Sequence, residues 1–198
     1  MSALPKSKYT LEEYLELDRN SEERWEYWDG EIYSMSGVSD QHDQIESNLH
    51  VNLSVRSASR GCRVFLANMR LKVPAMPPYR YGDSSALCDR PKFEKIGGVD
   101  VLTNPALIIE VLSTSTESYD RGDKFSSYKS IPTLSEYLLV AQHRPHVSQF
   151  IKQADGSWLN LESNALNDVL KVVTLGCELK LSELYQDVTF PAATPHIL

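Results

Sequence analysis

The chain has 198 residues, 41% hydrophobic and 24% charged, which suits one globular domain with a sizeable core. It has no run of roughly 18 apolar residues that could span a membrane, and its first residues lack the apolar core of a signal peptide. The net charge of −7 argues against a protein that simply coats nucleic acid. We expect a single domain over residues 1–190, a loose tail at 191–198, a cytoplasmic location and no membrane partner.

The predicted elements begin with a short helix. Thr10-Leu11-Glu12-Glu13 has the pattern of a capping box, and the helix runs to about Leu17. Residues 24–34 predict a hairpin that turns at Asp29-Gly30. Asp40 can cap a longer helix, which ends near Gly61. Apolar residues recur there every four positions, at Ile45, Leu49 and Leu53.

Strands are predicted next at 63–67, 69–73, 81–88 and 106–112. A second helix starts near Ser118 or Asp120, and Pro132 stops it after Ser130. Further strands follow at 136–141, 147–152 and 158–161, and residues 172–185 predict a short strand, a turn and a short helix. This order predicts a mixed α/β or α+β fold, with a central sheet flanked by helices.

The basic residues are concentrated in the middle of the chain. Residues 56–95 contain nine basic and three acidic side chains, so this segment carries +6 and the remainder −13. Such a segment is either a phosphate-facing surface or an ordinary solvated face. On the first interpretation, basic residues should border the cleft that holds the active site: Arg56, Arg60, Arg63, Arg70, Lys72 and Arg80.

The three cysteines, Cys62, Cys88 and Cys177, are an odd number without paired spacing. This pattern predicts reduced thiols in a reducing compartment.

Glu110 is unusual because it interrupts the apolar run 106–112, which is typical of a strand covered on both faces. A buried carboxylate must be paired, protonated or bound to a metal. On a strand it shares a face with Ile108 and Leu112. The alternatives are a solvated strand end and a buried ion pair.

Asp83 is a second unusual carboxylate. It lies between Gly82 and Ser84, and these small neighbours would let another backbone or a ligand approach closely. The alternative is a simple turn centred on Gly82-Asp83. Lys124 comes in the first turns of the second helix, where a lysine paired with Asp120 or Asp123 is the ordinary expectation.

Taken together, two carboxylates on neighbouring strands and a lysine on the next helix indicate a metal-dependent hydrolase. Carboxylate oxygens suit Mg²⁺, or Mn²⁺ in its place. Such an ion polarises a phosphoryl oxygen and activates bound water. Lys124 would orient that water or stabilise the charge of the transition state.

Four segments carry a resemblance to a known family: residues 25–33, 81–83, 105–113 and 120–124. They resemble the Uma family of restriction-type endonucleases, within the PD-(D/E)XK nuclease superfamily, and the resemblance spans about residues 9–150. It implies a restriction-endonuclease-like fold and a Mg²⁺-dependent endonuclease that acts on nucleic acid, with DNA as the favoured substrate. A homodimer is compatible with this interpretation.

The resemblance also implies roles for individual residues. Asp83 and Glu110 match the two acidic motif positions, and the backbone carbonyl of Val111 would be a further metal ligand. The chain departs from the superfamily pattern at Gly82, where a proline is usual, and at Leu112, where the catalytic lysine is usual. The lysine has moved to the helix, which makes Lys124 the candidate.

Superfamily members often add an acidic residue from the first core helix. Glu46 is the candidate by position, and His42 lies one turn earlier on the same face.

Other sites are weaker candidates. Residues 113–116 lack the pattern of a nucleophile elbow. His143 and His146 lack the paired cysteines of a zinc site. Trp25, Tyr27, Trp28 and Tyr33 could stack on bases but are expected in the core. The alternative function is a catalytically weak or inactive nucleic-acid-binding or protein-binding module on the same fold.

Overall fold

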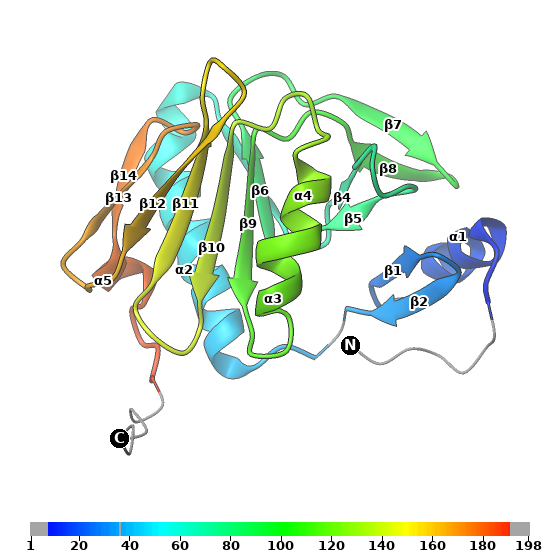
Figure 1. Ribbon diagram of the computed structural model, residues 1–198, viewed down its shortest axis with the longest axis horizontal. Helices are drawn as coiled ribbons and strands as arrows, with labels where there is room; N and C mark the ends of the chain where they lie inside the picture. Colours follow the sequence, from blue (N-terminus) through cyan, green and yellow to red (C-terminus); the bar gives the residue numbers. More distant parts are fainter. Residues whose placement is uncertain (1–7, 36, 191–198) are drawn as a thin grey trace.

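The computed structural model describes residues 8–35 and 37–190. At its centre lies a six-stranded sheet (Figure 1). The strand order is β12 (Trp158–Ser163), β11 (Val147–Lys152), β10 (Glu136–Ala141), β9 (Leu107–Leu112), β6 (Ser84–Leu87) and β3 (Arg63–Leu66). β9 and β10 are parallel, whereas the other neighbouring strands are antiparallel. The predicted central mixed sheet is confirmed.

Helices cover both faces of this sheet, as predicted. α2 (Asp40–Ser57) lies behind it in Figure 1, and the short 3₁₀ turn η1 (Ala58–Arg60) follows α2. In front lies a helical segment made of α3 (Glu117–Tyr119), the π-helix η2 (Asp120–Lys124) and α4 (Phe125–Tyr128).

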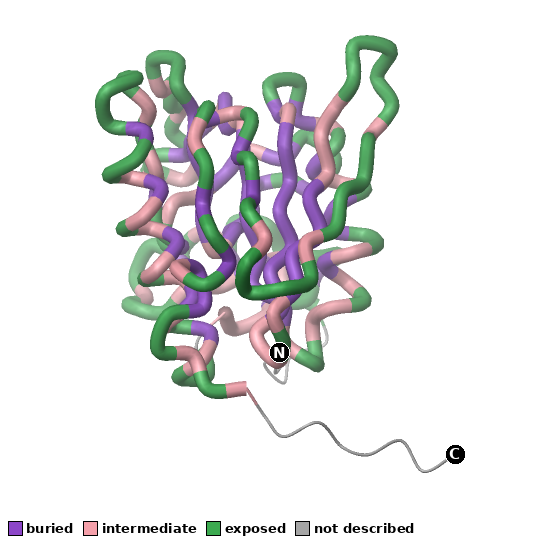
Figure 2. The backbone as a smooth tube through the Cα atoms, turned by 90° about the vertical axis from the view of Figure 1, so that its left-hand side faces the viewer, coloured by how far each residue is buried: buried purple, intermediate pink, exposed green. Residues whose placement is uncertain are grey.

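β9 is buried on both faces because it contributes to two hydrophobic cores. Leu107, Ile109 and Val111 pack in the core that includes the α2 side chains. Ile108 and Leu112 pack in the core on the side of α4. The alternation of side chains along a strand places Glu110 on the α4 side. Figure 2 shows the same distribution, with buried residues concentrated along the strands and exposed residues in the loops.

A smaller sheet lies beside the central one, with the order β5 (Arg80–Tyr81), β4 (Arg70–Leu71), β8 (Val99–Leu102) and β7 (Phe93–Ile96). Near it are α1 (Leu11–Asn20) and the hairpin of β1 (Trp25–Trp28) and β2 (Glu31–Ser34). Their shared core includes Tyr14, Ile32, Tyr79 and Tyr81. At the other end, β13 (Val169–Val172), β14 (Cys177–Lys180) and α5 (Leu181–Leu184) complete the described chain.

Local signals account for several element boundaries. Thr10 forms the predicted capping box with Glu13 at the start of α1. Asp29 and Gly30 form the predicted turn, with φ values of 46° and 86°. The N-cap of α2 is Ser39, whose hydroxyl accepts from the His42 amide, and not Asp40 as expected.

Two predicted elements are interrupted in the structure, and one hairpin was not predicted. Residues 81–88 do not form one strand, because β5 and β6 belong to different sheets and are separated by Gly82 and Asp83. The second helix is interrupted by the π-helix η2. The hairpin of β7 and β8 was not predicted, although Gly97 and Gly98, with φ values of 59° and 88°, supply a turn of the kind that joins such strands.

The expectation of three reduced cysteines is wrong, because Cys62 and Cys88 form a disulfide. Arg63 pairs with Leu87 between the antiparallel strands β3 and β6, so the next pair in that register is Cys62 and Cys88. Cross-strand pairing brings together thiols that are 26 positions apart in the sequence. Cys177 is free. The cysteines therefore give no support to a reducing compartment.

Within residues 8–35 and 37–190, no helix has both the length and the apolar character that crossing a membrane requires. The expected loose tail at 191–198 lies outside the described residues. The expectation of one domain over 1–190 stays a prediction.

Candidate active site

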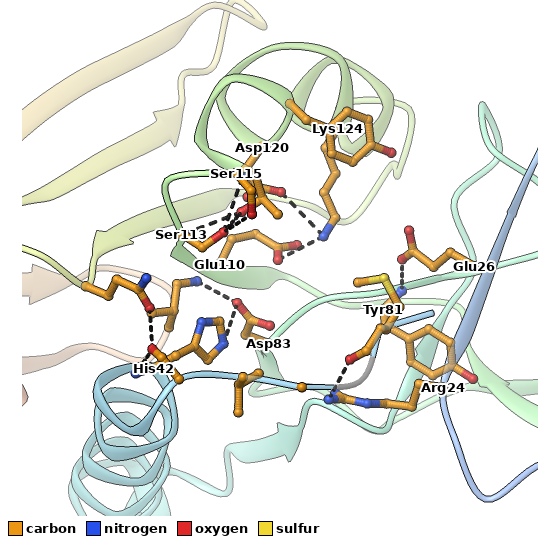
Figure 3. A pocket seen from close by; sticks show the side chains of 18 of the residues that line it. Arg24, Glu26, His42, Tyr81, Asp83, Glu110, Ser113, Ser115, Asp120 and Lys124 are labelled. Carbon is orange, nitrogen blue, oxygen red and sulfur yellow. Dashed lines mark hydrogen bonds and ion pairs between the residues drawn. The ribbon is translucent and has the colours of Figure 1, made fainter. Parts of the chain in front are cut away.

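A cavity of about 320 Å³ opens where the N-terminal hairpin, the start of α2 and the helical segment after β9 meet the central sheet (Figure 3). All three predicted catalytic residues line it, and so does the predicted carbonyl ligand: Asp83, Glu110, Lys124 and Val111. His42 lines the cavity, whereas Glu46, one turn further along α2, is not among the residues that line it. The sequence therefore identified residues that the fold brings together.

Asp83 occupies the break between β5 and β6, opposite Glu110. Ser84 pairs with Ile109, and the same antiparallel register continued by one residue places Asp83 against Glu110. Asp83 Oδ2 accepts a hydrogen bond of 2.6 Å from the Val111 amide. Burial disfavours the charge of Asp83, but the hydrogen bond with His42 and the Lys124 charge outweigh it and lower the pKa of the carboxyl.

Gly82 leaves room for side chains of the neighbouring strand β9. A Cβ atom at this position would lie 3.0 Å from Ile108 Cγ2 and 3.5 Å from Glu110 Oε1. The small residue beside Asp83 therefore accommodates the Ile108 and Glu110 side chains.

Glu110 is 3% exposed, and both of its oxygens have partners. Oε2 lies 2.9 Å from Lys124 Nζ, and Oε1 accepts a hydrogen bond of 2.8 Å from the Tyr128 hydroxyl. Burial raises the pKa of Glu110 well above its usual range, Asp83 and Asp120 raise it further, and Lys124 opposes the shift. The buried ion pair is thus present, and it sits at the wall of a cavity.

Lys124 is also 3% exposed. It ends the π-helix, a wider turn that is frequent at functional sites. Its Nζ lies 3.6 Å from Asp120 Oδ1 as well as near Glu110. Burial disfavours the ammonium, but the surrounding carboxylates, led by Glu110 and Glu26, outweigh it and raise the pKa of Lys124.

His42 and Glu46 lie one turn apart on α2. His42 Nε2 is 3.2 Å from Glu46 Oε1 and 3.5 Å from Asp83 Oδ2. Burial disfavours the imidazolium, but the hydrogen bonds with Asp83 and Glu46 outweigh it and raise the pKa of His42 to about 10. The two residues therefore form one polar cluster with Asp83.

Some cavity residues were not identified from the sequence. Glu26 on β1 is 4% exposed, and its Oε1 accepts a hydrogen bond of 2.8 Å from the Tyr81 amide. Its neighbours Trp25 and Tyr27, which were expected in the core, are partly buried and pack against the core that contains Tyr14 and Ile32. Glu26 could have been recognised in the sequence as a charged residue between two aromatic residues of a predicted strand. Trp28, also expected in the core, is 49% exposed.

The expected basic border of the cleft is limited to Arg80, whose Nε lies 4.0 Å from Oε2 of Glu26, a residue that lines the cavity. Within the described chain, none of the six basic residues named above lines the cavity. Several are engaged elsewhere: Arg70 with Asp18, Lys72 with Glu94 and Arg56 with Glu183. Their spacing in the sequence could not show which face they occupy.

The cavity itself is rich in carboxylates. Lys124, Arg24 and His42 are its basic residues, and its acidic residues are Glu26, Asp83, Glu110 and Asp120. Glu46 adds a fifth carboxylate beside His42.

The competing sites find little support. Ser113 shares hydrogen bonds with Ser115 and Thr116, so these hydroxyls form a local turn. Cys62 and Cys88 are joined to each other, which removes two of the thiols available to a zinc site.

Comparison with known proteins assigns the chain to a family. Residues 11–182 match the Uma2 family, described as "Putative restriction endonuclease". Two proteins of Synechocystis sp., both described as uncharacterized, are 33% and 37% identical to this chain. The first match covers 94% of this chain and 96% of the relative, and the second covers 77% and 86%.

A crystal structure described as a "putative nuclease belonging to DUF820", from Anabaena variabilis, has the same fold. The TM-score is 0.71 at 18% identity, over 89% of this chain and 97% of that one. The family match and the two relatives together show that this chain belongs to the Uma2 family of restriction-endonuclease-like proteins.

Proposed function

We propose that this protein is a metal-dependent endonuclease that hydrolyses phosphodiester bonds in nucleic acid, with DNA as the favoured substrate. The observation that carries the proposal is the placement of Asp83 opposite Glu110 at a cavity wall, with Lys124 Nζ 2.9 Å from Glu110 Oε2. One or two Mg²⁺ ions, or Mn²⁺, would bind there.

The residues present fit a divalent cation. The cavity holds more carboxylates than cationic side chains, and hard oxygen ligands suit Mg²⁺. Val111 supports the fit because its amide already faces Asp83. The N–H and C=O of one strand residue project to the same side, so the Val111 carbonyl is directed toward Asp83 as well.

In this mechanism the metal would polarise the phosphoryl oxygen and lower the pKa of its bound water. Asp83, Glu110 and the Val111 carbonyl would hold the ion, and His42 and Glu46 would support Asp83 from behind. Lys124 would stabilise the negative charge that develops on the phosphate. Tyr128, through its hydrogen bond, would fix the orientation of the Glu110 carboxylate.

The test is cleavage of plasmid DNA and of RNA with Mg²⁺ or Mn²⁺. Glu110→Gln should abolish cleavage, because the amide is nearly isosteric but binds a hard cation far less well. Glu178→Gln, at a side chain that is 64% exposed, is the matched control and should cleave like the parent. Cleavage by Glu110→Gln at the parental rate would refute the mechanism.

The alternative is a binding module that retains the fold without efficient cleavage. The observation that favours it is that none of the six predicted basic residues lines the described cavity. It becomes the preferred function if the parent protein neither cleaves nucleic acid nor gains stability from Mg²⁺ or Mn²⁺.

A further inference from the structure

Four aromatic residues of the N-terminal hairpin divide between its two faces. Trp25 and Tyr27 pack against the core that the hairpin shares with α1. Successive side chains of a strand point to opposite faces, so Trp28 lies on the other face of β1. The register of β1 on β2 places Tyr33 on that face as well. The core therefore accounts for only two of these four aromatic residues.

The face that carries Trp28 and Tyr33 is the one that borders the cavity. Glu26, two positions before Trp28 on β1, lines the cavity, and so does Met35, two positions after Tyr33. Glu26 is also the cross-strand partner of Tyr33. In Figure 3, Glu26 lies on the same side of the cavity as Lys124. The hairpin thus continues the cavity wall outward with two aromatic side chains.

Trp28 is a large aromatic side chain that stays open to solvent, at 49% exposed. The Arg80 guanidinium lies close to it, with Cζ 5.7 Å from the ring centroid. Arg80 is only 1% exposed, and its Nε lies 4.0 Å from Glu26 Oε2. A cation at this distance is attracted to an indole ring. The buried guanidinium therefore holds the exposed ring beside the wall of the cavity.

Tyr33 extends this surface. It is the diagonal neighbour of Trp28 across the hairpin, a separation that aromatic side chains can bridge. Its hydroxyl donates to the Glu31 carboxylate, which restrains the ring. The pKa of Tyr33 is raised to about 12 by this hydrogen bond, by burial and, to a smaller extent, by Tyr119, which lines the cavity. The Tyr33 hydroxyl is therefore within electrostatic reach of the cavity wall.

Two aromatic rings beside a cavity suit a flat, uncharged ligand. Nucleobases stack on aromatic side chains whatever their sequence, because every base has a π face. A base inside a duplex is already stacked on its neighbours, so only an unpaired base can lie on Trp28. The base itself carries no charge. Stacking can therefore add affinity where the carboxylates of the cavity repel phosphate.

We propose that Trp28 and Tyr33 form a stacking surface for an unpaired nucleobase, and that the substrate is a nucleic acid with a single-stranded segment. The inference rests on the proposed function for the identity of the ligand as nucleic acid, and it narrows the class of substrate. The stacked base would hold the strand at the hairpin while a neighbouring phosphodiester enters the cavity.

The test measures binding of oligonucleotides to the full-length protein, in Mg²⁺ and in a chelator. Phosphorothioate linkages make the probes resist hydrolysis; one probe is single-stranded and the other is a blunt duplex of the same length. Trp28→Ala should weaken binding of the single strand by about fivefold or more, the loss expected when one stacked base is released. Binding of the duplex should change much less. Phe93→Ala is the matched control and should bind like the parent, because Phe93 is 42% exposed but does not line the cavity.

Indole fluorescence reports stacking directly, because a base stacked on Trp28 quenches its emission. The other two indoles, Trp25 and Trp158, do not line the cavity. Trp28→Phe should keep most of the affinity, since an aromatic ring remains, but should lose most of the quenching. Tyr33→Ala should also weaken binding of the single strand, and it serves in place of Trp28→Ala if that variant does not fold.

Three results would overturn the proposal. The first is unchanged binding of the single strand in the folded variants. The second is an equal loss of affinity for the single strand and the duplex. The third is a parent protein that binds the single strand in neither buffer.

These measurements separate the stacking surface from the proposed function, because hydrolysis plays no part in them. A protein that binds the single strand through Trp28 but does not cleave nucleic acid would contradict only the proposed endonuclease. A protein that cleaves nucleic acid, but whose Trp28→Ala variant binds the single strand like the parent, would contradict only the stacking surface.

Discussion

Lys124→Ala should destabilise the metal-free protein strongly. Lys124 Nζ lies 2.9 Å from Glu110 Oε2, and both residues are 3% exposed. Removing one partner of a buried ion pair leaves the other charge uncompensated, which costs about 3–5 kcal/mol. In a chain of this size the melting temperature should fall by roughly 6–20 °C.

Mg²⁺ should restore part of this loss. The variant keeps Asp83 and Glu110 but lacks the ammonium that competes with a metal for them. Free Mg²⁺ at about 100 times its Kd stabilises a folded protein by about 2.7 kcal/mol. We therefore expect Mg²⁺ to raise the melting temperature of Lys124→Ala by more than that of the parent.

The assay is thermal unfolding with a chelator and with Mg²⁺, beside a matched surface variant. Lys171 has a side chain that is 76% exposed, 3.9 Å from Glu178, so Lys171→Ala should change stability by no more than about 0.5 kcal/mol. The reasoning fails if Lys124→Ala melts like Lys171→Ala in chelator. It also fails if Mg²⁺ stabilises Lys124→Ala no more than the parent.

Two further results are expected. Because the pKa of His42 is raised to about 10, the stability that its charge contributes is present below the unfolded pKa of about 6.5 and is lost as pH rises through 10. The difference in unfolding free energy between the metal-free parent and His42→Asn, measured by denaturant titration, should therefore shrink over this range. A difference that stays constant with pH would contradict this prediction. Tyr128→Phe should cost about 1.5–3 kcal/mol, since the hydroxyl donates to the Glu110 carboxylate at 2.8 Å; equal urea midpoints would show that this bond contributes nothing.

The central sheet could be predicted from the sequence because the pattern of apolar residues shows which strands are buried. The run 106–112 is apolar on both faces, so β9 had to lie inside a covered sheet. Glu110 could be recognised there because a carboxylate in such a strand requires a partner. The turn at Asp29-Gly30 and the cap at Thr10 are local signals, and the structure contains both.

The remaining features depend on contacts between distant parts of the chain. The pairing of Cys62 with Cys88 follows from the register of β3 on β6, which the cysteine spacing does not encode. The basic residues between 56 and 95 are dispersed because they lie on different elements with their own acidic partners. The position of Lys124 depends on a π-helix, which sequence periodicity did not reveal.

On the proposed function, the acidity of the cavity would determine the order in which metal and phosphate bind. A phosphate that enters the metal-free cavity would meet the carboxylates of Glu26, Asp83, Glu110 and Asp120. The Lys124 ammonium already forms an ion pair with Glu110. Like charges repel strongly in a poorly solvated site. A divalent cation bound first would remove this repulsion and add to the positive charge of Arg24 and His42. Because such coupling is reciprocal, bound phosphate would tighten the metal in return. On the proposed function, a chain with a net charge of −7 would therefore act on a polyanion only after cations complete its site.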